Sequence, residues 1–280
     1  MAAAPDALGT IEVDRQEYVL GDSVEARVSI SGLTPLSPGV VALGQMRTME
    51  QSSGVSDGNP AITTLDKEFV EVAGTEVSAD ASGSVNQRVV LQIPPRSVPS
   101  AGLEIQWHVA GVFADGATVE SPAFKVLVPR ETFLDLLGPP GWSARPSAQH
   151  PELRFEVGDR CVRCGDTLDG SLVFTPAKDR RVRDASVRIE CLLATDYRTL
   201  FKERTEIGGD IEIAHGETRE FPFSIPIPRT AGPTAWDYAT DGSADGPEAV
   251  IEWHLFGKLK TGRLVGSTEI FAPINVYNGP

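Results

Sequence analysis

The chain has few of the residues that would cross-link it or insert it into a membrane. Its 280 residues include three cysteines, Cys161, Cys164 and Cys191, an odd number that provides no disulfide framework. No apolar run approaches the roughly 18 residues of a membrane span, and the first residues have neither a basic nor an apolar leader region. We therefore expect a cytoplasmic protein with no membrane insertion.

Basic and aromatic residues are also scarce. The 25 Lys and Arg face 39 Asp and Glu, which gives a formal net charge of -14. Residues 1–129 carry 7 basic and 16 acidic residues (7 - 16 = -9), and residues 130–280 carry 18 and 23 (18 - 23 = -5). Aromatic residues make up 7% and do not alternate with basic ones. This composition disfavours nucleic acid and anionic membranes as partners.

The common catalytic and nucleotide-binding motifs are missing. The sequence has no G-x-S-x-G, no H-E-x-x-H, no P-loop and no dinucleotide fingerprint. It therefore predicts no enzymatic activity and no cofactor, although carboxylates that only folding brings together would leave no such motif.

One stretch occurs twice, at residues 103–128 and 250–276. Each copy alternates Ile, Trp, and Val or Leu with polar residues, then has a Gly-containing turn and a second alternating run. Because side chains alternate across a strand, each copy predicts a β-hairpin with one apolar face. The residues expected in the core are Ile105, Trp107, Val109, Ile251, Trp253 and Leu255. Those expected to face solvent or an outer layer are Gln106, His108, Glu252 and His254.

The rest of the chain shows a pattern of short strands. The first half has about seven strand signals at a spacing of roughly ten residues, such as residues 24–30 and 85–93, and no long helical pattern. Residues 50–64 are rich in Ser, Gly, Asp and Asn and predict a long loop. Residues 233–247 predict a second polar loop, inserted before the second copy of the hairpin.

Landmarks recur in the same order in the two halves. The offset is 144 residues between Gly21 and Gly165, 146 between Trp107 and Trp253, and 150 between Val126 and Val276. Near-constant offsets indicate duplication of a whole domain. We therefore predict an all-β protein with two tandem β-sandwich domains.

The predicted domains cover residues 1–129 and 151–280, and residues 130–150 are the predicted linker. Residues 131–137 favour a short helix within this linker. Its apolar side chains, Phe133, Leu134 and Leu137, would either dock on a domain or form a partner-binding linear motif.

The order of these landmarks resembles the arrestin fold family, including the bacterial sporulation-control proteins and, more distantly, the arrestin-related retromer cargo subunit. The matching segments are Tyr18-x-x-Gly21-Asp22-Ser23, its repeat Gly165-Asp166-Thr167, Phe221-Pro-Phe-Ser-Ile-Pro226, Ile251-Glu-Trp-His-Leu255 and Pro273-Ile-Asn-Val276. The resemblance implies two arrestin-like sandwiches and a non-catalytic adaptor that binds proteins through its interdomain concavity, loops and strand edges. The first half departs from the pattern, with Val89-Val-Leu-Gln-Ile-Pro94 in place of the Phe-Pro-Phe form.

The cysteines form one C-x-x-C, Cys161-Val-Arg-Cys164, with Cys191 farther along. Structural zinc normally takes four ligands in two close pairs, and the second pair is missing here. Redox pairs commonly open a helix, whereas this pair precedes a strand. Packing or incidental cysteines are the preferred interpretation, and a metal site and a redox pair are the alternatives.

A single basic cluster and two loops supply the candidate partner-binding residues. The cluster spans residues 178–183 and is either a solvated turn or a docking site for an acidic partner or phosphate, possibly the acidic first half of another copy. The candidate residues are Asp57, Asn59, Arg180, Arg181, Arg183, Trp236 and Tyr238.

The sequence thus favours a non-catalytic cytoplasmic adaptor or scaffold with an unidentified protein partner. A self-assembling structural subunit is the alternative, and a metal-dependent binder or enzyme is the third hypothesis.

Overall fold

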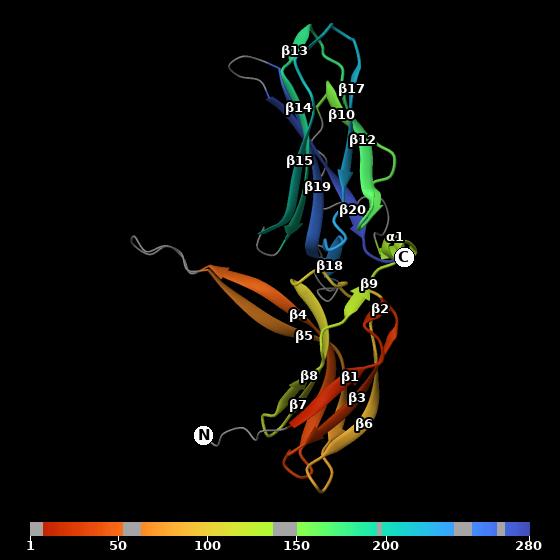
Figure 1. Ribbon diagram of the computed structural model, residues 1–280, viewed down its shortest axis with the longest axis vertical. Helices are drawn as coiled ribbons and strands as arrows, with labels where there is room; N and C mark the ends of the chain where they lie inside the picture. The colour runs from red at the N-terminus through yellow and green to blue at the C-terminus, as the bar shows by residue number, and fades with distance from the viewer. Residues whose placement is uncertain (1–7, 53–62, 137–149, 195–197, 238–247, 262–266) are drawn as a thin grey trace, which may run out of the picture. The chain divides into compact units, whose positions relative to one another are not determined.

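The computed structural model describes residues 8–52, 63–136, 150–194, 198–237, 248–261 and 267–280 (Figure 1). Almost all of the regular structure is strand, and the one helix among these residues is α1 (Arg130–Leu136). The predicted all-β class is therefore confirmed. The chain divides into two compact units, Met1–Val128 and Pro129–Pro280.

The first unit contains two sheets that pack face to face and a separate parallel pair. One sheet has the order β1-β3-β6, the other has the order β5-β4-β7-β8, and β2 pairs with β9. The strands are β1 (Leu8–Val13), β2 (Glu17–Val19), β3 (Ser23–Ser31), β4 (Pro38–Ser52), β5 (Thr63–Ser78), β6 (Val85–Gln92), β7 (Ile105–Phe113), β8 (Thr118–Glu120) and β9 (Lys125–Leu127).

The second unit has a similar set of sheets. One has the order β10-β12-β17, a larger one contains β11-β20-β19-β14-β15 with β18 beside β19, and β13 pairs with β16. The strands are β10 (Leu153–Val157), β11 (Cys161–Arg163), β12 (Thr167–Phe174), β13 (Arg180–Val182), β14 (Asp184–Leu193), β15 (Arg198–Gly208), β16 (Ile211–Ile213), β17 (Arg219–Pro226), β18 (Ala235–Asp237), β19 (Glu248–Lys260) and β20 (Ser267–Tyr277).

The two units share one topology. The order β1-β3-β6 corresponds to β10-β12-β17, and β5-β4-β7 corresponds to β15-β14-β19. Trp107 lies opposite Gln45 of β4, and Trp253 lies opposite Cys191 of β14. Aligning these two pairs assigns to each residue of β4 and β7 a counterpart in β14 and β19.

In each unit a strand near the start of the unit pairs in parallel with a strand near its end, β2 with β9 and β11 with β20. We call each of these parallel pairs a crossing, and equivalent contacts hold both of them. Val126 of β9 lies beside Tyr18 of β2, and Val276 of β20 lies beside Val162 of β11. The Val126 amide donates to Ser100 Oγ at 2.8 Å, and the Val276 amide donates to Thr234 Oγ1 at 2.9 Å. In return, the amides of these two hydroxyl residues donate to the carbonyls of the same valines, each at 2.8 Å.

The turn that follows β2 or β11 depends on glycine. Gly21 has a φ of 92° and Gly165 a φ of 93°, a region that other residues rarely occupy. The Gly21 amide donates to the carbonyl of Ile93 and the Gly165 amide to that of Ile227, at 3.2 and 2.9 Å. The turn therefore ties the crossing to the residue that follows β6 or β17, an edge strand of the three-stranded sheet.

The predicted core of the repeated hairpin is confirmed. The six residues Ile105, Trp107, Val109, Ile251, Trp253 and Leu255 are each at most 2% exposed. Buried indole nitrogens need an acceptor, and Trp107 Nε1 donates to the Val98 carbonyl at 3.1 Å. Trp253 Nε1 donates to the Gly232 carbonyl at 2.9 Å.

The second strand of the hairpin differs between the units, which corrects the prediction for the first copy. In the second unit β20 is continuous and pairs with both β19 and β11. In the first unit the corresponding stretch divides into β8, which pairs with β7, and β9, which leaves to pair with β2. Ser121 lies at the break, where its amide donates to the Val109 carbonyl and its Oγ accepts the Val109 amide. Proline alone does not explain the break, because β20 contains Pro273 opposite His254 and stays continuous.

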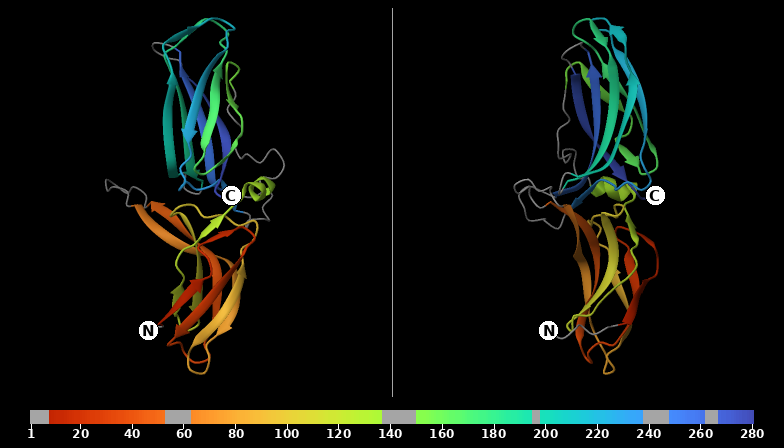
Figure 2. Two further views of the ribbon diagram at one scale, coloured as in Figure 1. Left: turned by 45° about the vertical axis from the view of Figure 1, so that its right-hand side comes forward. Right: turned by 60° about the vertical axis from the view of Figure 1, so that its left-hand side comes forward.

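The prediction that residues 50–64 form a loop is wrong for the first and last residues of this range. β4 continues to Ser52 and β5 begins at Thr63, with these two residues paired. β4 pairs with β7 over Gly39–Arg47, and Thr48 still bonds the carbonyls of Glu104 and Leu103. Beyond Thr48 the strand partner of β4 among the described residues is β5. We call the paired segments 48–52 and 63–67 the arm, which extends past β7 in Figures 1 and 2.

The second predicted loop and the predicted linker also contain structure. Within residues 233–247, Ala235–Asp237 form β18. Helix α1 lies in the second unit, where Phe133 is 1% exposed and its ring contacts those of Trp236 and Tyr277. Leu134 is 40% exposed. Leu137 lies outside the described residues.

Substitution of either core tryptophan tests the packing directly. Trp107→Ala or Trp253→Ala removes a buried ring and its hydrogen bond, which should lower the free energy of unfolding by about 3–5 kcal/mol. Urea denaturation measures this, with Leu103→Ala as a control because Leu103 is 76% exposed. Unchanged midpoints in both Trp variants would disprove the core assignment.

The glycine turns make a second prediction. A Cβ at Gly21 meets no atom within 4 Å, so Gly21→Ala tests backbone conformation alone. The positive φ should cost about 1–2 kcal/mol of stability. Gly158→Ala is the matched control, because that site is equally open and has no positive φ. Equal melting temperatures for the two variants would contradict the proposed role of the turn.

Candidate functional site

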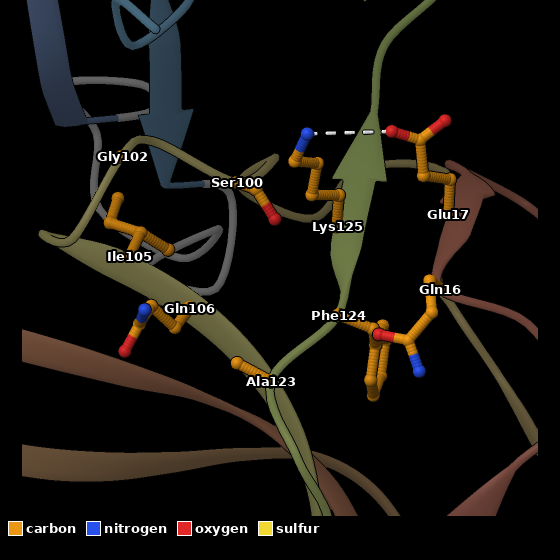
Figure 3. Close-up of a pocket in the computed structure, with 9 residues that line it drawn as sticks. All are labelled: Gln16, Glu17, Ser100, Gly102, Ile105, Gln106, Ala123, Phe124 and Lys125. Atoms are coloured by element: carbon orange, nitrogen blue, oxygen red, sulfur yellow. Dashed lines mark hydrogen bonds and ion pairs between the residues drawn. The ribbon is translucent and has the colours of Figure 1, made fainter.

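A cleft of about 300 Å³ in the first unit combines an apolar floor with a polar rim. Ile105, Ala123 and Phe124 form the floor, and Gln16 and Gln106 contribute side-chain amides to the rim. Figure 3 shows Ile105 and Gln106 on one side and Gln16 and Phe124 on the other. The cleft therefore offers an apolar surface together with hydrogen-bond donors and acceptors.

Packing and the parallel crossing position the residues of the cleft. The Phe124 ring is 4% exposed and meets the edge of the Tyr18 ring, with a distance of 5.1 Å between centroids. At the end of the cleft, Lys125 Nζ lies 3.4 Å from Glu17 Oε1 on the neighbouring strand. Both of these side chains are more than half exposed, so the ion pair adds little stability.

The cleft is lined by two titratable side chains, Glu17 and Lys125, which lie beside each other. Its one hydroxyl, Ser100 Oγ, accepts the Val126 amide and so supports the crossing. The lining residues include no histidine or cysteine that would act as a base or nucleophile. Sequence reasoning missed the cleft because its residues come from three separate segments, near positions 16, 100–106 and 123–125.

The basic cluster is partly neutralised by its own neighbours. Arg181 on β13 makes two hydrogen bonds to Asp210 Oδ1, at 2.9 and 2.6 Å, and this carboxylate raises the pKa of the guanidinium. Arg180 is half-buried and its Nε makes no hydrogen bond among the described residues, and Arg183 is exposed. Arg180 and Arg181 line a shallow pocket together with acidic residues, including Glu212.

The remaining partner-binding candidates have different outcomes. The Trp236 ring is half-buried and contacts the Phe133 ring of α1, with 6.0 Å between centroids. Trp236 therefore helps to hold α1, and its contact with a partner stays a prediction. Asp57, Asn59 and Tyr238 lie outside the described residues.

The C-x-x-C motif lies at β11 and its turn, where burial makes both thiols poor nucleophiles. Cys161 is on β11 and Cys164 follows it, with its Sγ 3.4 Å from the Ala231 carbonyl. Burial raises the pKa of Cys161 to about 11 and that of Cys164 to about 12, and it also raises the pKa of Cys191. Thiolate, the form that binds metal and attacks disulfides, is thus disfavoured at all three cysteines.

The two equivalent histidines have different surroundings. His108 is half-buried, and its Nδ1 lies 3.0 Å from the Ser121 carbonyl. His254 is 4% exposed, so of the two expected surroundings, solvent and an outer layer, it has the outer layer, and its Nε2 lies 3.6 Å from Glu252 Oε2. Its ring also meets the rings of Phe256 and Phe271 edge-on.

No helix in the described part of the chain is long and apolar enough to cross a membrane. Within the same residues, no three His, Cys, Asp or Glu side chains come together in a way that would hold a metal ion.

Comparison with known proteins does not assign the chain to a family. No family model matches the chain, and no curated protein matches it. A match among solved structures is Spo0M, a sporulation control protein from Bacillus subtilis, with 14% identity and a TM-score of 0.33. The match covers 45% of this chain and 48% of that one, so it spans about half of each. This similarity is too low to support a conclusion, and membership of the arrestin family stays a prediction.

The thiol pKa values predict slow alkylation. At pH 8 an ordinary thiol with a pKa of 9.0 is about 10% ionised, whereas one at about 11 is about 0.1% ionised. Iodoacetamide should therefore modify Cys161 and Cys164 at least about 100-fold more slowly in the folded protein than in urea. Equal rates in the two states, or zinc retained after purification without a histidine tag, would contradict this picture.

Proposed function

We propose that the protein is a non-catalytic cytoplasmic adaptor that binds other proteins through its loops and strand edges. The observation that carries this proposal is the arm. Its paired strands extend beyond the sheet that anchors them and carry residues 53–62, which include the candidates Asp57 and Asn59. Binding surfaces are commonly loops held on a rigid scaffold, and here the sandwich provides that scaffold.

Free strand edges support the same function. Within the described residues, β5 pairs only with β4, and the equivalent β15 pairs only with β14. The outer backbone groups of such strands can bind an extended segment of another protein. β5 is 16 residues long, which is enough for several consecutive backbone contacts.

Shortening the arm tests the proposal. Met49 and Asp66 lie opposite each other, so an Asn-Gly turn can join them in place of residues 50–65. Affinity capture from the source cytosol, followed by mass spectrometry, should recover a specific protein with the intact chain and lose it with the short arm. The melting temperatures of the two proteins should agree, because the removed residues of β4 pair only with β5 among the described residues.

A partner retained by the short-arm variant would contradict the role of the arm. Recovery of only the protein itself would contradict the adaptor function and favour a self-assembling subunit. Charge supports this second candidate, because Arg180 and Arg183 belong to a basic cluster and residues 1–129 carry a net charge of -9 (7 - 16). Light scattering separates the two candidates, since a monomer at micromolar concentration would exclude stable self-assembly.

A further inference from the structure

The two units differ at one edge of their three-stranded sheets. This edge is β6 in the first unit and β17 in the second, and among the described residues β6 pairs with β3 alone and β17 with β12 alone (Figure 1). Gly21 bonds the carbonyl of Ile93, and Gly165 bonds that of Ile227, so these equivalent bonds align the two strands. Three positions then correspond, with the β6 residue first: Arg88 and Pro222, Val90 and Ser224, and Gln92 and Pro226.

Half of the backbone groups of β6 point away from the sheet. The Ile93 amide donates to the Asp22 carbonyl at 2.8 Å, so the backbone of Ile93 faces the β3 side. Along an antiparallel strand, residues that bond the neighbouring strand alternate with residues that point the other way. The residues that direct their amide and carbonyl to the open edge are therefore Asn86, Arg88, Val90 and Gln92.

Proline blocks the corresponding edge of the second unit. The Ile227 amide donates to the Asp166 carbonyl at 2.8 Å, so Pro222 and Pro226 lie at positions that face the open edge of β17. Proline has no amide hydrogen to donate to an added strand, and it is one of the residues that protect sheet edges from pairing. β6 keeps its amides at both positions. The same fold therefore closes this edge in one unit and leaves it open in the other.

The side chains beside the open edge form a row with unbalanced charge. Arg88 lies directly opposite Arg27 of β3, and Arg27 lies opposite Glu12 of β1. Arg88 also contacts Glu25 on β3. Like charges on directly opposed residues of neighbouring strands are destabilising. An acidic residue on a strand added beside Arg88 would offset this repulsion.

The next position along the open edge is apolar. Val90 is 63% exposed in the middle of β6, where its counterpart on β17 is a serine. Directly opposed side chains of neighbouring strands lie about 4.5–5.5 Å apart and pack against each other. A strand added along β6 therefore meets an arginine and, two residues farther on, an exposed valine.

We propose that β6 binds an extended segment of a partner protein, which adds to the sheet as an antiparallel strand. Antiparallel pairing is the more stable arrangement. In this arrangement the segment has an acidic residue opposite Arg88 and, two positions earlier, an apolar residue opposite Val90. Backbone hydrogen bonds supply the affinity, and these two side-chain contacts select the segment. The inference rests on the proposed adaptor function, for which it names one strand edge and the chemistry of the partner.

The positions of the charges favour this partner over a second copy of the chain. Adjacent strands are about 4.8 Å apart, so an added strand lies about 14 Å from β1 and Glu12, beyond the screening length of about 8 Å at physiological salt. Its acidic residue is next to Arg88. A second β6 contains no acidic residue to offer Arg88, and it would bring together two units with a net charge of -9 (7 - 16) each.

The test uses the full chain and a synthetic probe. The probe is a fluorescent peptide of about ten β-favouring residues, with Val two positions before Glu and one Lys that makes its net charge zero. Fluorescence anisotropy at physiological salt should show saturable binding. Methylation of the peptide nitrogens that face β6 should weaken binding at least tenfold, whereas methylation of those that face solvent should change it less than threefold. Equal affinity for the two methylated peptides, or no saturable binding of the probe, would overturn the proposal.

Proline variants place the binding at β6. Arg88→Pro combined with Gln92→Pro introduces the residues that β17 has in the same register, and it should weaken binding at least tenfold. The control, Arg88→Ala combined with Gln92→Ala, removes the same side chains but keeps both amides. It should weaken binding about two- to fivefold. Equal losses would show that strand addition is not the mode of binding and would refute the proposal. If melting curves show that the proline variant does not fold, the methylated peptides decide.

Reversal of one charge tests the selected side chain. Arg88→Glu should weaken binding of the probe and strengthen binding of a second peptide that has Lys in place of Glu. Arg219→Glu is the control, because Arg219 is an exposed arginine on the equivalent edge strand β17. It should change the affinity of either peptide less than twofold. If the two variants behave alike, Arg88 does not select an acidic residue and the proposal fails.

The proposed adaptor function can fail or hold separately from this inference. The short-arm variant should bind the probe as tightly as the intact chain does, because β6 is not part of the arm. A partner captured from cytosol without any binding of the probe would refute the role of β6 and leave the adaptor function. Binding of the probe with no partner captured from cytosol would contradict the adaptor function and leave the strand-addition site.

Discussion

The parallel crossing between an early and a late strand is the constraint on which each unit depends. In both units one hydroxyl residue makes two hydrogen bonds to one valine: Ser100 to Val126, and Thr234 to Val276. The hydroxyl oxygen accepts the valine amide, and the amide of the hydroxyl residue donates to the valine carbonyl. The crossing brings the two ends of a sandwich together, and a glycine turn ties it to the facing sheet. Because this frame is repeated, differences between the two units lie mainly on their surfaces.

The two units share the tryptophan sites of the core but differ in the residues of their outer faces. Trp107 and Trp253 occupy equivalent buried sites, each with an indole hydrogen bond to a backbone carbonyl. On the opposite side of the same strands, Ala110 corresponds to Phe256 and Val112 to Lys258. Packing limits which residue types fit a core position, whereas a position on the outer face accepts a wider range of residue types.

The sequence predicted the parts of the fold that local alternation encodes. Ile105, Trp107 and Val109 alternate strictly, and their burial followed from the pattern. The arm was missed because polar residues such as Ser52 and Thr63 favour loops by composition, whereas backbone pairing that starts in the core continues through them. The contact of Trp236 with Phe133 was missed because the two residues are about a hundred positions apart. The cleft likewise depends on residues from three separate segments.

The central claim is that two equivalent crossings hold the frames of the two units, and that the arm extends from the first frame. Native-state hydrogen exchange of the Val126 and Val276 amides tests it most directly. The account predicts that the Val126 and Val276 amides exchange only when their whole unit unfolds, so the denaturant dependence of their exchange free energy should equal that of global unfolding. The amides of the arm should instead exchange through small local openings. Exchange of either valine amide through a local opening with little denaturant dependence would contradict the account.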